Sequence, residues 1–109
     1  MEVHVAWTYL ILAGLCEIGW PVGLKLGWTD DGPRPLWIGF AILCIGLSGA
    51  LLLLAQRAIP MGTAYAVWTG IGAVGTFALG ILAFGDPAAP LRIAAASLII
   101  AGVIGLKFA

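Results

Sequence analysis

The sequence predicts an all-α integral membrane protein with four transmembrane helices. Of its 109 residues, 62% are hydrophobic and 9% are charged, whereas a soluble domain carries roughly a quarter charged residues. The apolar residues form four runs, each close to the roughly 20 residues that cross the hydrocarbon of a bilayer. Proline occurs in all three segments between the runs, as is typical of turns. The chain is therefore expected to form one transmembrane domain over residues 1–109.

The predicted spans cover residues 5–26, 36–55, 61–84 and 91–108. The first run lacks a basic N-terminal segment and contains an acidic residue, so a cleaved signal peptide is not expected. The uncharged part of the fourth run, residues 93–106, has only 14 residues. This run crosses the bilayer only if Arg92 and Lys107 extend their charged ends to opposite interfaces.

Glu17 lies near the middle of the first span and is the residue most indicative of function. The other four acidic residues lie at the N-terminus or between the spans. A charged side chain at the bilayer centre costs at least about 3 kcal/mol, and such residues generally mark an ion or substrate path. No basic residue lies one helical turn away to pair with it. The alternative is a protonated carboxyl group that is hydrogen-bonded within a helix bundle.

Small residues share the helical face of Glu17. Ala13 and Gly14 lie one turn before it and leave space for a partner helix or a ligand, and Trp20 lies at the edge of the same face. This face is therefore a candidate site for a bound solute.

The third span carries hydrogen-bonding groups and ring faces on one stripe of an apolar helix, at Tyr65, Trp68, Thr69 and Thr76. Ordinary packing between membrane helices also uses such residues, but we favour a binding site for Tyr65 and Trp68 together. Ser48 is the single hydroxyl of the second span. It is expected either to donate a hydrogen bond toward Glu17 or to pack between helices.

Small residues also suggest how the helices meet and move. A small side chain at every fourth position of the fourth span predicts a dimer seam; its residues are Ser97, Ala101 and Gly105. Closely spaced glycines in the third span allow close packing or bending. We predict a possible hinge at Gly70, Gly72 and Gly75.

No feature of the sequence indicates a metal ion, a cofactor or an enzyme. Cys16 and Cys44 fall in the middle of different spans and are interpreted as packing residues. The net charge of zero gives no reason to expect a nucleic-acid partner. Nucleotide-binding, metal-binding and nucleophile motifs are absent. These absences argue against an enzyme, whereas a membrane carboxylate such as Glu17 favours a secondary active transporter.

The charges between the spans do not fix an orientation in the membrane. Both termini are predicted on one side, which carries two basic residues, Arg57 and Lys107, against three on the other: Lys25, Arg34 and Arg92. The positive-inside rule does not decide on so small a difference, so a single topology and insertion in both directions remain open. Four helices enclose little space, and no internal repeat is present. We therefore expect an antiparallel homodimer with the symmetry that larger transporters obtain from inverted repeats.

Three segments carry a family resemblance: AGLCEIGWPVGLK (13–25), IPMGTAYAVWTGIGAVGT (59–76) and IAAASLIIAGVIGLK (93–107). Over essentially its whole length the chain resembles the small multidrug resistance family, and within it the guanidinium-exporter subtype. The resemblance implies a dual-topology antiparallel homodimer in the bacterial inner membrane. It also implies that protons and a guanidinium-type cation exchange at Glu17, with a site lined by Trp20, Ser48, Tyr65 and Trp68.

One position departs from the family pattern. Pro21 stands where a small residue is commoner, and it cannot donate an amide hydrogen to the carbonyl of Glu17. We expect a kink there or an additional free acceptor. Two alternatives to a guanidinium exporter remain. One is a broad-spectrum exporter of quaternary ammonium and other lipophilic cations, and the other is a non-transporting membrane assembly protein.

Overall fold

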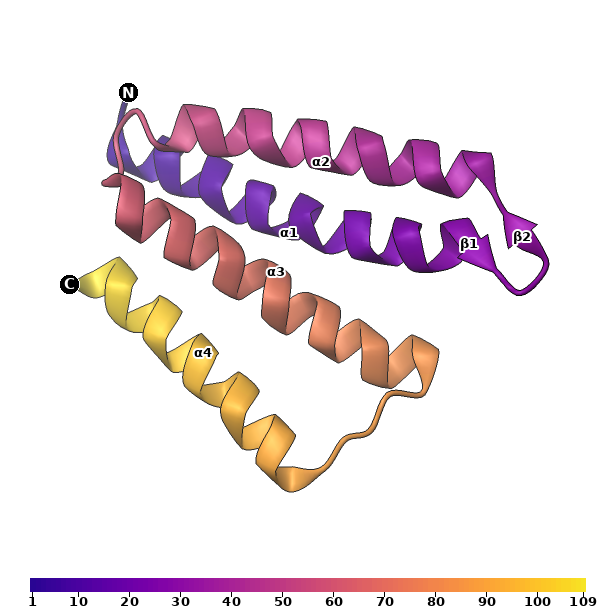
Figure 1. Ribbon diagram of the computed structural model, residues 1–109. Helices are drawn as coiled ribbons and strands as arrows, with labels where there is room; N and C mark the ends of the chain where they lie inside the picture. The colour runs from indigo at the N-terminus through magenta and orange to yellow at the C-terminus, as the bar shows by residue number, and fades with distance from the viewer.

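The computed structural model describes residues 1–109 as four helices joined by short connections (Figure 1). The helices are α1 (Val3–Gly27), α2 (Pro35–Ala55), α3 (Met61–Phe84) and α4 (Pro90–Phe108). All four are long and apolar enough to cross a membrane, which confirms the prediction of four spans. Each helix begins and ends within two residues of the predicted run.

The connection between α1 and α2 differs from the simple loop that the sequence suggested. It contains a two-stranded antiparallel ribbon, formed by β1 (Trp28–Thr29) and β2 (Gly32–Pro33). Gly32 has a φ of 105°, a left-handed conformation that glycine adopts without steric cost. Strands of two residues leave no periodic pattern in a sequence, so this ribbon could not be recognised from residue types.

Helix α1 lies between α2 and α3, and α4 packs mainly against α3 (Figure 1). Both termini lie at one end of the bundle together with the α2–α3 connection. The β-ribbon and the α3–α4 connection lie at the other end. This arrangement agrees with the alternating directions expected of four consecutive spans.

A row of glycines allows α1 to approach α2 closely. Its members are spaced four residues apart: Gly19, Gly23 and Gly27. A Cβ atom added at Gly23 would lie 2.9 Å from the Cβ atom of Ala41 and 3.0 Å from the carbonyl oxygen of Trp37. Helices in membranes associate through such rows of small residues because lipid provides no hydrophobic force between them. This row was not among the features predicted from the sequence.

The α1–α3 interface uses glycines on both helices. A Cβ atom at Gly14 of α1 would lie 2.7 Å from the Cβ atom of Ile71 in α3. The reverse arrangement occurs one turn further along, where Ile18 of α1 lies against Gly75 of α3. Each isoleucine therefore occupies the space that the opposing glycine leaves free.

The buried apolar core lies at the end of the bundle that carries the termini. Its residues are Ala6, Leu10, Ala55, Ile59, Ala64 and Val67. They come from α1, α3 and the segment from the end of α2 to the start of α3. No residue of α4 is buried. The first three helices therefore form the packed part of the chain.

Helix α4 is close to the rest of the chain near its C-terminal end and diverges toward its start (Figure 1). At the close approach, a Cβ atom at Gly70 of α3 would lie 2.5 Å from Cγ2 of Val103. The Lys107 ammonium lies 5.1 Å from the centroid of the Trp7 ring, a cation–π distance. Residues 85–89, which contain no helix or strand, bridge the gap at the diverging end.

We predict that Gly23→Ala lowers the free energy of unfolding by about 1–3 kcal/mol, because the added methyl group overpacks the α1–α2 contact. The measurement is unfolding of the detergent-solubilised protein in dodecyl sulfate, followed by circular dichroism. The control is Gly46→Ala on α2, where an added Cβ atom meets nothing within 4 Å. Equal stability of both variants would contradict the role of the glycine row.

Candidate functional site

The carboxylate of Glu17 accepts a hydrogen bond from the indole nitrogen Nε1 of Trp20, one helical turn further along α1. It accepts no other hydrogen bond and has no basic partner, since the single ion pair of the structure joins Arg34 and Asp31. The helix continues through Pro21, so the proline does not end α1. It does leave the carbonyl of Glu17 without its usual amide donor.

Glu17 lines an open groove of about 300 Å³ between α1 and α3. The other lining residues are Trp20 and Pro21 of α1 and Thr69, Gly72, Ala73 and Thr76 of α3. The α3 backbone comes close to the glutamate, since a Cβ atom at Gly72 would lie 2.6 Å from Cγ of Glu17. Any larger residue at Gly72 would therefore displace the Glu17 side chain.

Two successive hydrogen bonds, which meet at the buried hydroxyl of Ser48, join three helices next to the turn that carries Glu17. Nε1 of Trp68 in α3 donates to Oγ of Ser48 in α2 at 2.8 Å, and this Oγ donates to the carbonyl oxygen of Ala13 in α1 at 2.8 Å. The same carbonyl is four residues before Glu17, so it is the helical acceptor for the Glu17 amide. These two hydrogen bonds thus connect α2 and α3 to the turn of α1 that carries the glutamate.

Of the two alternatives for Ser48, the structure agrees with packing between helices. Ser48 is fully buried, and its hydroxyl donates to the turn of α1 that precedes the glutamate rather than to Glu17. The relative positions of α1 and α2 along their axes decide which turn it meets, and residue types alone do not specify these positions. Within the single chain Ser48 is not among the residues that line the groove.

Tyr65 lies outside the groove of the single chain. Its side chain is 57% exposed, and its ring centroid is 5.6 Å from that of Trp68. The two rings are tilted by 46° and form an aromatic pair on α3. Tyr65 and Trp68 are thus neighbours, and Trp68 is connected to the turn before Glu17 through Ser48.

Two groove residues, Thr69 and Thr76, belong to the α3 stripe that the sequence indicated, although the predicted site named only Tyr65 and Trp68 from that stripe. They are seven residues apart on α3 and flank Gly72, so they share one helical face. Their hydroxyl groups offer hydrogen-bond donors and acceptors beside the carboxylate. The seven-residue spacing was the signal available in the sequence.

The residues of the predicted hinge are packed against other helices, whereas those of the predicted dimer seam are exposed. The three hinge glycines lie at contacts with α1 or α4 within an uninterrupted α3; they are Gly70, Gly72 and Gly75. The three seam residues are exposed on α4: Ser97, Ala101 and Gly105. Bending of α3 and pairing of α4 with a second copy remain predictions.

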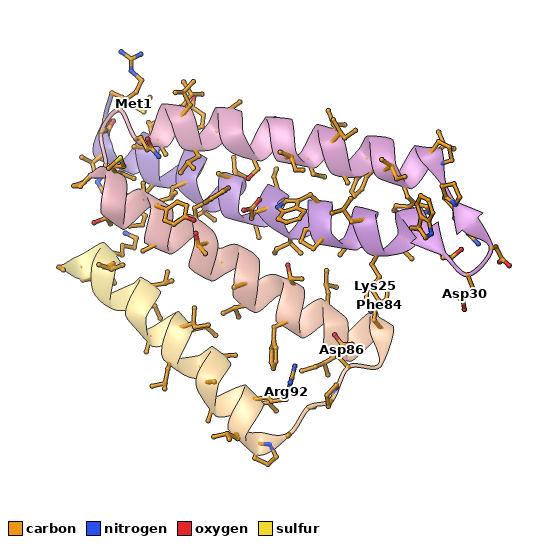
Figure 2. All side chains as sticks on the ribbon, viewed as in Figure 1. Met1, Lys25, Asp30, Phe84, Asp86 and Arg92 are labelled. Atoms are coloured by element: carbon orange, nitrogen blue, oxygen red, sulfur yellow. The ribbon has the colours of Figure 1, made fainter.

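A smaller cavity of about 130 Å³ adjoins the groove and shares Pro21 and Thr76 with it. It extends to Lys25, Phe84 and Asp86, which lie together at the end of the bundle near the α3–α4 connection (Figure 2). The Lys25 ammonium lies 5.2 Å from the centroid of the Phe84 ring. Polar and charged groups thus extend from Glu17 to this end of the bundle.

Comparisons with known proteins connect this chain to one family of membrane proteins. The model of the small multidrug resistance protein family matches residues 5–106. Proteins named guanidinium exporter from Citrobacter freundii and Klebsiella oxytoca are each 48% identical over 105 residues, covering 94% of this chain and 96% of theirs. A guanidinium exporter from Escherichia coli K12 is 46% identical over 103 residues, with the same coverage.

We predict that Ser48→Ala lowers the free energy of unfolding by about 1–3 kcal/mol, because it leaves the half-buried Trp68 donor without an acceptor and removes the hydrogen bond that ties α2 to the Ala13 carbonyl. Detergent unfolding curves measure the change. The matched control is Ser97→Ala on exposed α4, where the hydroxyl bonds only to the carbonyl of Ile93 in its own helix. If the two variants lose equal stability, the chain of hydrogen bonds does not hold the three helices together.

Proposed function

The chain belongs to the small multidrug resistance family, and on that premise we propose that it exports guanidinium and small guanidinyl cations in exchange for protons. It is a multi-pass membrane protein of the bacterial inner membrane. The observation that carries the proposal is Glu17, a carboxylate within a membrane-spanning helix that faces an open groove and has no basic partner. The relatives named guanidinium exporter support the choice of substrate.

The groove suits a small planar cation. Guanidinium presents parallel N–H donors that match the two oxygens of a carboxylate. Trp20 holds one oxygen of Glu17 and leaves the other free to accept hydrogen bonds. The hydroxyl groups of Thr69 and Thr76 and the ring of Trp20 offer further polar and cation–π contacts.

Proton coupling follows from competition for one group. A carboxylate within a bilayer requires a compensating positive charge, and either a bound cation or a proton supplies it. A proton that reaches Glu17 displaces the cation, and a cation that binds displaces the proton. The two fluxes are then coupled without a second site.

The transporting unit in this proposal is an antiparallel homodimer. The groove at Glu17 is open in the single chain, and a second copy would close it and add a second Glu17. The small residues of α4 are exposed, and a Cβ atom at Gly105 meets nothing within 4 Å. This face is therefore free to pack against the same face of another copy.

We predict that Glu17→Gln abolishes proton-driven guanidinium uptake by proteoliposomes of the purified protein, while the helical content stays unchanged. The amide can still accept the Trp20 hydrogen bond but cannot exchange a proton or balance a cation. The measurement is uptake of labelled guanidinium under an imposed pH gradient. The control is Glu2→Gln, the same change at the exposed N-terminus, which should keep full flux. Retained uptake by the Glu17 variant would refute the mechanism.

The same assay separates the alternatives when tetraphenylphosphonium replaces guanidinium. Little flux of this bulky cation beside gradient-dependent guanidinium flux identifies a selective exporter. Flux of both cations assigns the protein to the broad-spectrum exporters. Absence of both fluxes from folded protein favours a non-transporting assembly role.

We predict that Gly105→Leu converts the purified dimer to a monomer. The larger side chain has open space within one chain but would clash with a helix packed on the α4 seam. The molecular mass of the detergent-solubilised protein, measured by light scattering, reports the change. Gly62→Leu, at another glycine with nothing within 4 Å, is the control and should remain dimeric. A dimeric Gly105 variant would exclude the seam as the interface.

A further inference from the structure

The divergence of α4 from α3 creates an apolar groove that the proposed transport does not use. Near the α3–α4 connection it has a volume of about 350 Å³, and its lining includes Val74 and Phe77 of α3 and Ala95, Ala96 and Ile99 of α4. A second groove of about 280 Å³ shares Val74 and continues to Ile100 and Val103. Together they follow α4 from its first turns to the close approach at Gly70.

One cationic side chain lies in this groove, that of Arg92 in the first turn of α4. Figure 2 shows Arg92 between α3 and α4, near their connection. Its guanidinium lies 5.7 Å from the centroid of the Phe77 ring. Arg92 makes no ion pair, although Asp86 lies six residues earlier on the α3–α4 connection. A guanidinium group at the edge of a bilayer without a carboxylate partner is a ready binding site for a phosphate group.

A second copy of the chain does not account for this groove. Successive residues of an α-helix are rotated by 100°, so Arg92, Ala96 and Ile99 share one face of α4. The seam of Ser97, Ala101 and Gly105 lies on the opposite face. A partner helix packed on the seam therefore leaves the α3–α4 groove open to the bilayer.

We propose that this groove binds one anionic phospholipid per chain. The phosphate oxygens accept hydrogen bonds from Arg92, and an acyl chain lies between α3 and α4 along the apolar lining. Charge complementarity selects the head group, and the groove fits an alkyl chain because it offers no hydrogen-bonding side chain besides that of Arg92. The bound lipid would fill the space between α3 and α4 at the end where the two helices diverge. This site does not depend on whether the protein transports guanidinium.

The test is native mass spectrometry of the detergent-solubilised protein with added dioleoylphosphatidylglycerol or dioleoylphosphatidylcholine, which have the same acyl chains. We expect one retained phosphatidylglycerol per chain and much weaker retention of phosphatidylcholine. Arg92→Gln should weaken phosphatidylglycerol binding about tenfold, because a charge-assisted hydrogen bond is lost. Arg57→Gln removes the same charge from the exposed α2–α3 connection and is the matched control. Equal loss in both variants would overturn the proposal.

A second variant tests the acyl part of the site. Ala96→Leu keeps Arg92 but fills the groove, and it should also weaken phosphatidylglycerol binding. Inorganic phosphate, which lacks an acyl chain, should not compete with the lipid. Undiminished binding by the Ala96 variant, or displacement by free phosphate, would refute a lipid site. The same spectra report the assembly mass, and loss of the dimer in the Arg92 variant would assign the groove to contacts between copies instead.

Discussion

The close approach of α1 to its two neighbours is the constraint on which the rest of the structure depends. Within a bilayer the surrounding lipid is as apolar as the side chains, so helices associate through close packing rather than through the hydrophobic effect. The glycine row of α1 faces α2, and glycines on both α1 and α3 receive side chains of the opposite helix. Close contacts at these glycines thus hold the helices together, whereas a soluble protein of this size would depend on a larger buried core.

This packing also determines the position of the Glu17 carboxylate. Glu17 lies on the helix that both neighbours approach, with the backbone of α3 at Gly72 against its side chain. On the other side, Ser48 ties the preceding turn of α1 to α2 and, through Trp68, to α3. Two sides of the glutamate are therefore held by protein, and the third faces the groove. A displacement of α3 along α1 would move the groove lining past the carboxylate, which would link helix movement to the proposed binding site.

The sequence predicted well those features that depend on residues close together in the chain. The four spans follow from the lengths of apolar runs, and the association of Glu17 with Trp20 follows from their spacing of three residues. Features that depend on how two helices are aligned were not predictable. For this reason the sequence left open whether Ser48 donates toward Glu17 or packs between helices. It placed Thr69 and Thr76 on one stripe of α3 without showing that this stripe meets α1. The β-ribbon was missed because its strands are too short to show a pattern.

The absence of buried residues in α4 has a consequence for the local stability of the chain. This helix contacts mainly α3 and buries none of its own residues there, so few contacts are lost when it moves away. Separation of α4 from α3 therefore costs less free energy than separation of α1 from α2 or α3. Motion within one chain is expected to begin at α4, while the three other helices stay packed.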